Sequence, residues 1–244
     1  ILGERYPVSQ DQLARRIVEE GAEALFKDVP IGQFGKLLTV DRREIESYRS
    51  ISAVLGEYCS GPQDRPISIA VFGPPGSGKS FGVAQVADSI RPNAIKTLTF
   101  NLSQFQDPSE LVAALHQVRD VGLSGKIPLV FWDEFDCRLG QEEYGWLRYF
   151  LAPMQDGAFA QDGINRPIGP AIFIFAGGTH ATMDSFKERA LELPGAKATD
   201  FLSRLRGYVD VLGPNPDSST DRTYHLRRAI LLRAVLQRNA PQIF

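Results

Sequence analysis

Cysteine, histidine, methionine and tryptophan are all scarce in this sequence of 244 residues. The two cysteines are far apart, and neither they nor the three histidines have the spacing of a metal-binding motif. We expect reduced thiols and histidines in ordinary packing or surface positions (Cys59, Cys137, His116, His180 and His225). Neither a Cys/His metal site nor a disulfide framework is predicted.

Long apolar runs and an excess of charge of one sign are also absent. No run of about 18 apolar residues, the length that a membrane-spanning helix needs, occurs, and the first residues are too charged for a signal peptide. The 27 Lys and Arg against 29 Asp and Glu give a formal charge of -2, which provides no reason to expect non-specific nucleic-acid binding. We expect a cytoplasmic protein. The missing initial methionine indicates a processed or engineered fragment.

Most of the chain alternates continuous apolar runs with amphipathic segments. The runs are 67–72, 95–100, 127–132, 171–176 and 208–212. Helical patterning is found in 8–27, 41–60, 79–90, 108–120, 141–151, 181–192 and 221–238, and the second of these begins with a capping-box-like Asp41 and Glu44. Residues 30–35 are expected to form a loop. Apolar strands separated by helices predict an α/β fold, with a five-stranded parallel sheet between helices.

The segment GPPGSGKS follows the first of these strands and precedes a helix. It has the G-x-x-x-x-G-K-[ST] pattern of a phosphate-binding loop, and a Gly/Pro-rich turn is the alternative. Glycines let the backbone fold around phosphates, the lysine reaches the β- and γ-phosphates, and the serine hydroxyl is a ligand for Mg²⁺. The predicted nucleotide-binding residues are Gly73, Pro74, Pro75, Gly76, Ser77, Gly78, Lys79 and Ser80.

The apolar run IPLVFW ends directly in the carboxylates of Asp133 and Glu134. A buried parallel strand delivers its C-terminal end to the ligand crevice, so Asp133 is predicted to hold Mg²⁺. Glu134 is predicted to polarise a water for attack on the γ-phosphate. Asp136 is expected to be a turn residue or the cap of the next helix.

GPPGSGKS followed by VFWDEFD resembles the AAA+ ATPases, over roughly residues 31–212. The resemblance implies a P-loop NTPase core at 31–213, preceded by an N-terminal helical extension at 1–30. Residues 214–244 would begin a helical lid, truncated before its sensor-2 arginine. It further implies Mg²⁺-dependent ATP hydrolysis that drives remodelling of a macromolecular client within a ring oligomer, expected to be a hexamer.

The resemblance also implies roles for individual residues. Thr179 falls where the family has sensor 1, which orients the attacking water; a simple helix N-cap is the alternative. Ile31 and Gly32 fall where an apolar-Gly element contacts adenine, although a loop packed on the core explains them equally well. Phe105 occupies the aromatic position of a polypeptide-threading pore loop, but the residues after it depart from that pattern, and a packed aromatic beside Asp107-Pro108 is the alternative.

Two arginines in DFLSRLRGYVD stand where AAA+ proteins have an arginine finger, which contacts the nucleotide of the neighbouring subunit. Arg204 is the first candidate and Arg206 the second, with a surface arginine as the alternative, and a monomer is expected to show Arg204 facing solvent. The lid-like helix 221–238 is expected to have an apolar side (Leu226, Ile230 and Leu231) and a solvated basic face (Arg227, Arg228 and Arg233).

Other functions are weighed against ATP-driven remodelling. An ATP-gated switch or scaffold that recruits a partner remains open, with hydrolysis only resetting its state. A two-domain helicase needs a second core for which 244 residues leave no room, and no [NT]-K-x-D element for guanine is present. A small-molecule kinase remains possible from the phosphate loop alone, but the two carboxylates favour an ATPase. The client is not indicated.

Overall fold

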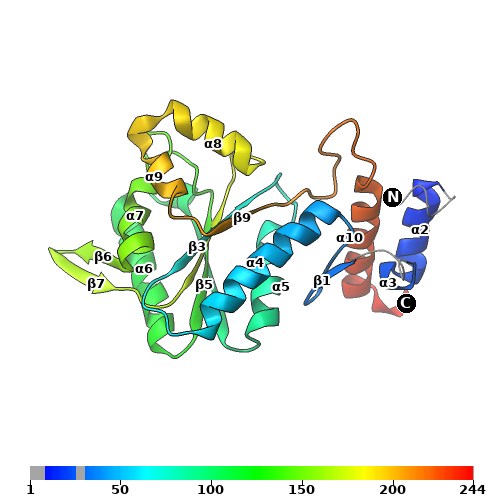
Figure 1. The fold of residues 1–244 in the computed structure, drawn as a ribbon, viewed down its shortest axis with the longest axis horizontal. Helices are drawn as coiled ribbons and strands as arrows, with labels where there is room; N and C mark the ends of the chain where they lie inside the picture. The colour runs from blue at the N-terminus through cyan, green and yellow to red at the C-terminus, as the bar shows by residue number, and fades with distance from the viewer. Residues whose placement is uncertain (1–8, 26–30, 244) are drawn as a thin grey trace.

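The computed structural model describes residues 9–25 and 31–243, and its centre is a parallel sheet (Figure 1). Five strands lie in the order β4-β5-β8-β3-β9. They are β3 (Ile67–Phe72), β4 (Ile95–Asn101), β5 (Ile127–Asp133), β8 (Ile172–Ala176) and β9 (Gly207–Asp210). The predicted strands and fold class are therefore confirmed. With its phosphate-loop sequence between a strand and a helix, the chain has the P-loop NTPase fold that the AAA+ resemblance implies.

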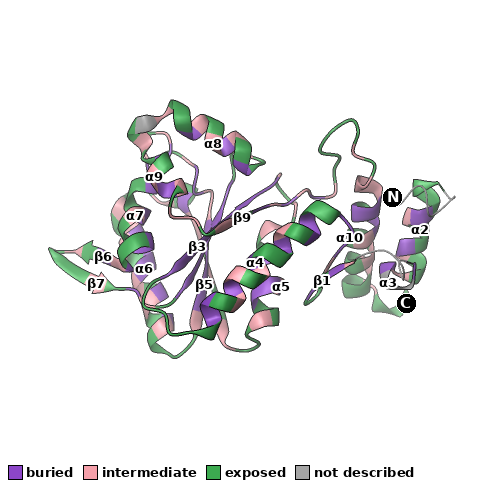
Figure 2. Ribbon diagram, viewed as in Figure 1, coloured by how far each residue is buried: buried purple, intermediate pink, exposed green. Residues whose placement is uncertain are grey.

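The apolar runs form strands because both faces of the sheet are covered. All six residues of β3 are buried, and they alternate between two cores. Ile69 and Val71 belong to one core and Ala70 and Phe72 to the other. The central strands β3 and β5 are accordingly drawn mostly in the colour of buried residues in Figure 2.

Helices form a layer on each side of the sheet. One core is closed by α4 (Arg42–Ser60) and α5 (Lys79–Ile90). The other is closed by α6 (Pro108–Leu123), α7 (Leu147–Asp156), α8 (Met183–Glu192) and α9 (Ala198–Leu202). Short 3-10 turns are η1 (Leu102–Gln104), η2 (Pro194–Ala196) and η3 (Pro241–Ile243).

A third, smaller core joins segments from opposite ends of the sequence. It contains α2 (Gln10–Glu20), α3 (Ala22–Leu25) and α10 (Tyr224–Asn239), whose helices lie side by side in Figure 1. The predicted helix at 8–27 is divided at Gly21, where φ is 94°, and its predicted apolar residue Phe26 lies outside the described residues. Among the described residues, no helix has the length and apolarity to cross a membrane.

Two hairpins were not predicted. β1 (Gly32–Phe34) pairs with β2 (Leu37–Thr39), so the loop predicted for 30–35 is wrong at residues 32–34, while Gly35 lies in the hairpin turn. β6 (Ala158–Gln161) pairs with β7 (Ile164–Pro167), and the two project from the body of the fold in Figure 1. Asp162 and Gly163 connect them with φ values of 52° and 75°, as a tight hairpin turn requires.

One predicted helix start and one predicted capping box need correction. The helix predicted at 141–151 begins only at Leu147, because Tyr144 has a φ of 57°, which a right-handed helix cannot include. Asp41 caps α4 as predicted, accepting from the backbone N–H of Arg43 at 3.0 Å. Glu44 does not complete a capping box; its carboxylate accepts from the Thr39 hydroxyl at 2.7 Å and from the Leu212 N–H at 3.1 Å.

Phe105 packs within the fold. It is half-buried, and its ring lies 5.9 Å from that of Trp146 and 6.5 Å from that of Phe100. Asp107 is the N-cap of α6, and Pro108 is the first residue of that helix. These contacts agree with the packed-aromatic alternative.

Candidate functional site

The phosphate-loop sequence connects β3 to α5 through three glycines in positive-φ conformations. The φ values are 149° at Gly73, 76° at Gly76 and 86° at Gly78, which is the N-cap of α5. A Cβ atom at Gly76 or Gly78 would meet no atom within 4 Å, so the backbone there is open to a ligand. A Cβ at Gly73 would lie 2.5 Å from the Val211 carbonyl oxygen, so the packing of the loop against Val211 leaves no room for a side chain there. The loop fits phosphates because exposed N–H groups meet the positive end of a helix.

Lys79 lies at the start of α5 and turns back over the loop. Its Nζ donates to the carbonyl oxygen of Gly73 at 2.8 Å. Burial lowers the pKa of this ammonium group, while the carboxylates of Asp133, Asp136 and Glu134 act in the opposite direction. The structure thus brings the predicted lysine and the acidic end of β5 together. The Ser80 residue, next in the helix, is exposed.

The two predicted carboxylates lie at the C-terminal end of β5. Asp133 is half-buried, and burial raises the pKa of its carboxyl group, although Lys79 lowers it. Glu134 has a φ of 55°, an uncommon conformation for a residue other than glycine. A Cβ at Gly178 would lie 2.8 Å from Glu134 Cγ, so this side chain lies against the turn after β8.

A metal at this site would have few protein ligands. Among the described residues, no group of three or more His, Cys, Asp or Glu side chains could hold a metal ion. Ser80 and Asp133 offer the hard oxygen ligands that Mg²⁺ prefers, and this ion normally completes its shell with water and substrate phosphates. The residues therefore fit Mg²⁺ bound together with a nucleotide, and not a metal held by protein alone.

Asp136 is the main residue that sequence reasoning missed. Only 3% of it is exposed, and its carboxylate accepts backbone hydrogen bonds from Gly178 (2.8 Å), Thr179 (2.9 Å) and His180 (3.2 Å). Asp136 lies in a turn, as predicted, but its carboxylate is buried and holds the turn after β8, so it is neither a solvated turn residue nor a helix cap. The signal in the sequence was its position next to Phe135, inside the aromatic core, where an exposed turn residue would not be placed.

Thr179, the predicted sensor 1, is exposed in this turn. It is not the N-cap of α8, because Thr182 has that position and accepts from the Ser185 N–H at 3.2 Å. The helix-cap alternative for Thr179 is therefore wrong. The Asp136 carboxylate joins Thr179 to the end of β5. The turn that contains Thr179 is the one against which the Glu134 side chain lies.

Arg204 is held by its own chain. Its guanidinium donates to the side-chain oxygen of Gln155 (Nε at 3.1 Å) and to the carbonyl oxygen of Asp200. The residue is half-buried, so the expectation that it faces solvent freely is wrong. Arg206, the second candidate, is exposed. Neither arginine lines the cavity beside the phosphate loop.

A cavity of about 440 Å³ lies beside the phosphate loop, a volume within the range of small-molecule sites. Its walls come from the loop, the β1-β2 hairpin, α2 and α10. Residues from these walls include Ser77, Gly78, Phe81, Leu37, Thr39, Ile17, Ile230 and Leu231.

The cavity does not include the two residues predicted to contact adenine. Ile31 packs against the third core, and Gly32 is buried in β1, where a Cβ would lie 2.8 Å from Ile45 Cγ1. The lining residues of the same hairpin are Gln33 and 36–39. The two predicted residues therefore belong to a hairpin that borders the cavity, but they do not line it.

The predicted basic face of α10 is also corrected. Arg227 is 7% exposed and bonded on all sides, as described below. Arg233 donates to the carbonyl oxygens of Val18 (2.6 Å) and Glu19 (3.0 Å) at the end of α2. Arg228 is exposed, but it donates to the carbonyl oxygen of Pro214 at 2.9 Å. These arginines hold α10 to its neighbours. The first turns of α10 are mostly packed against other segments, and the helical pattern of the sequence does not reveal this packing.

Comparisons with known proteins found similarity only at the level of solved structures. The chain matches no protein-family model, and no curated protein is similar to it in sequence. The ORC2 protein of Aeropyrum pernix, in ADPNP-ADP complexes, has a TM-score of 0.48 and 14% identity, over 91% of this chain and 56% of that chain. NtrX of Brucella abortus, in complex with ATP, has a TM-score of 0.47 and 15% identity, over 82% of this chain and 41% of that chain. The chain thus spans about half the length of these structures, and at such identities the likeness concerns the fold alone.

Proposed function

We propose that this chain binds ATP with Mg²⁺ and hydrolyses it to ADP and phosphate. The observation that carries the proposal is the alignment of the ends of β3 and β5, where Val71 and Asp133 both pair with Ala176 of β8. This alignment places Asp133 and Glu134 on the same side of the sheet as Lys79 and a glycine loop open to a ligand. A phosphate loop and helix N-terminus provide binding, and carboxylates at the end of β5, which β8 separates from β3, provide what hydrolysis needs. The adjoining cavity has room for the base.

Each residue has a distinct part in the proposed reaction. Lys79 and the backbone N–H groups of the loop bind the β- and γ-phosphates, while Ser80 and Asp133 hold Mg²⁺, which neutralises charge on the phosphates. Glu134 orients a water and takes its proton. Thr179 is proposed to align this water, because Asp136 fixes the turn after β8, which contains Thr179 and against which the Glu134 side chain lies.

The wider activity is also proposed: a ring oligomer, expected to be a hexamer, in which hydrolysis remodels a macromolecular client. In such a ring Arg204 would leave Gln155 and reach the nucleotide of the neighbouring subunit, where its charge offsets that developing in the reaction. A cytoplasmic location remains a prediction.

One observation favours the second candidate, an ATP-gated switch. Because Arg204 is bonded to Gln155 and Asp200, an isolated chain would bind ATP without this arginine at any γ-phosphate. Binding would then be the functional event, and hydrolysis would reset it. Glu134→Gln separates the two candidates: partner recruitment that persists when hydrolysis is abolished supports the switch.

The first test is nucleotide binding by calorimetry and phosphate release at several protein concentrations. Lys79→Met is expected to weaken ATP binding by about 10- to 100-fold, since a charge-assisted contact is lost. Lys96→Met, at an exposed position on β4, is the control and should bind ATP normally. Glu134→Gln should bind ATP and release no phosphate. Wild-type affinity in Lys79→Met would refute the proposed site, and turnover per chain that does not rise on self-association would refute the shared-site ring.

A further inference from the structure

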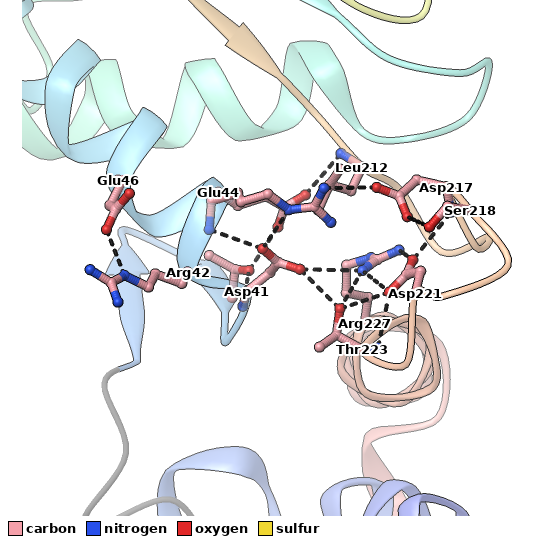
Figure 3. Close-up of polar contacts among 12 residues, drawn as sticks. Asp41, Arg42, Glu44, Glu46, Leu212, Asp217, Ser218, Asp221, Thr223 and Arg227 are labelled. Atoms are coloured by element: carbon pink, nitrogen blue, oxygen red, sulfur yellow. Dashed lines mark hydrogen bonds and ion pairs between the residues drawn. The ribbon is translucent and has the colours of Figure 1, made fainter. Parts of the chain in front are cut away.

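Arg227 lies in the first turns of α10 and has its whole guanidinium engaged (Figure 3). Nε donates to the carbonyl oxygen of Gly213 at 2.7 Å, and Nη2 donates to Asp221 Oδ2 at 2.6 Å. Nη1 donates to the Thr223 hydroxyl at 2.8 Å and lies 3.4 Å from Asp41 Oδ2. One side chain therefore joins α10, the N-cap of α4 and the segment between β9 and α10, which we call the linker (residues 211–223).

The linker lies directly on the phosphate loop. Gly213 has a φ of 73°, and a Cβ there would lie 2.9 Å from Ser77 Cβ and 3.2 Å from Ser77 Cα. Two residues earlier, the Val211 carbonyl approaches Gly73 so closely that no side chain would fit there. Glu44 holds the residue between them, accepting from the Leu212 N–H at 3.1 Å. A movement of the phosphate loop at Ser77 thus displaces the same glycine whose carbonyl Arg227 binds.

The contacts of Arg227 also position the part of α10 that lines the cavity. Ile230 and Leu231 follow in α10 and line the cavity, as Arg227 itself does. Ser77 and Gly78 of the phosphate loop line the same cavity. The phosphate loop and α10 are therefore connected by two successive contacts, the first between Ser77 and Gly213 and the second between Gly213 and Arg227.

We infer that Arg227 is a positioning residue that makes the placement of α10 over the cavity depend on the state of the phosphate loop. The inference rests on the proposed nucleotide binding and adds its consequence: an occupied loop holds the linker, and the linker holds α10 through Arg227. A planar fork with five donors suits this task, because it fixes several acceptors in one geometry. Lysine keeps the charge but has a single compact ammonium group, so Arg227→Lys separates geometry from charge.

The surrounding charges explain why this position needs a buried cation. Asp41 is 5% exposed and Glu44 7% exposed, and the Asp221 side chain is 1% exposed. Arg43 also pairs with a linker residue, Asp217, at 2.8 Å, but its own side chain is 60% exposed. Arg43→Gln is therefore the matched control: it removes a linker ion pair of the solvent-exposed kind, which contributes little.

The test is hydrogen exchange of the intact chain, with and without saturating ADP and Mg²⁺, in the wild type, Arg227→Lys and Arg43→Gln. Saturation is set from the ADP affinity measured for each variant. In the wild type and Arg43→Gln, ADP is expected to slow exchange severalfold in both the phosphate loop and α10. In Arg227→Lys, ADP should still slow exchange in the loop, while exchange in α10 becomes independent of ADP.

Two results would overturn the inference: a nucleotide-dependent change in α10 that survives in Arg227→Lys, or a wild-type α10 that ignores ADP while the loop responds. Failure of the proposed function is distinct, because then ADP changes neither the loop nor α10 in the wild type. If circular dichroism shows that Arg227→Lys is unfolded, Asp221→Asn takes its place. That variant keeps the arginine and weakens its nearest ion pair, so it should reduce the response of α10, and an unchanged response would contradict the inference.

Discussion

The Asp136 carboxylate accepts the backbone N–H of Thr179 at 2.9 Å, and this bond joins the end of β5 to the turn after β8. Asp136 is two residues after Glu134, whose side chain lies against the same turn at Gly178. The proposed water-activating and water-aligning residues are therefore fixed relative to each other by a buried carboxylate that binds the backbone of the turn.

Asp136→Asn is expected to bind ATP but to hydrolyse it much more slowly. An amide offers one acceptor oxygen in place of two, so at least one of the three N–H groups loses its partner. The free energy of unfolding should fall by about 1–3 kcal/mol, the cost of an unsatisfied buried group. Calorimetry, phosphate release and urea denaturation measure the three effects. Asp120→Asn, exposed on α6, is the control, and equal turnover in the two variants would contradict the role of Asp136.

Gly213→Ala is expected to weaken nucleotide binding, because its Cβ would press on Ser77 at 2.9 Å. Gly169→Ala is the matched control, since Gly169 also has a positive φ (83° against 73°) but open space around a Cβ. In both variants, a non-glycine residue in the left-handed conformation should lower the free energy of unfolding by about 1–2 kcal/mol. Only Gly213→Ala should lose ADP affinity, and equal ADP affinity in both variants would show that the linker does not influence the phosphate loop.

Arg204→Ala is expected to leave ATP binding intact and to slow hydrolysis on the order of 10³-fold. Mixing it with Glu134→Gln chains should restore part of the turnover, because each variant supplies what the other lacks. Gln155→Ala removes a partner of Arg204 and keeps the arginine, so it should retain activity. If Arg206→Ala loses hydrolysis and Arg204→Ala does not, the assignment passes to Arg206.

The stability contribution of Asp221 is expected to depend on pH. Burial raises the pKa of its carboxyl group, but hydrogen bonds from Arg227, the Asp217 N–H and Thr223 outweigh burial and hold the pKa well below its usual range. The unfolded-state pKa is about 3.9, so the stabilisation is fully present above that pH and is lost as pH falls toward the folded-state pKa.

Asp221→Asn should therefore lower the free energy of unfolding by about 2 kcal/mol near neutral pH, the scale of hydrogen bonds to a charged group. The difference from the wild type should shrink below about pH 4. Urea denaturation across this range measures it. Asp217→Asn, whose partner Arg43 is largely exposed, should show a smaller difference. If the difference in free energy of unfolding between Asp221→Asn and the wild type stays constant with pH, the ion pair is not its cause.

The central strands β3, β5 and β8 could be predicted because they are buried on both faces. β3 begins and ends at the predicted residues, Ile67 and Phe72, since all six of its residues, five of them apolar, are buried. The β6-β7 hairpin could not be predicted in this way: only its Phe159 is buried, and Ile164 is 56% exposed, so its pairing leaves no apolar pattern. Its turn residues Asp162 and Gly163 are a local signal that was not recognised.

Some residues of the candidate site could likewise be predicted from local sequence patterns, and others could not. The phosphate loop and the two carboxylates follow from short local patterns, in which type and spacing determine the role. Asp136 and Arg227 do not, because their partners are up to 186 positions away in the sequence. A buried charged residue is identified by the contacts that it makes after folding, and neither helical period nor motif contains that information.

The helices α2 and α10 bear on how the cavity comes into existence during folding. Ile17 and Ile230 form parts of its wall, and they come from opposite ends of the described chain. Contacts between such distant segments close the longest loops and are expected to form late, after the sheet. A ligand of this cavity would therefore recognise only fully folded molecules and would shift the folding equilibrium toward them, so its concentration would help to set the lifetime of the native state.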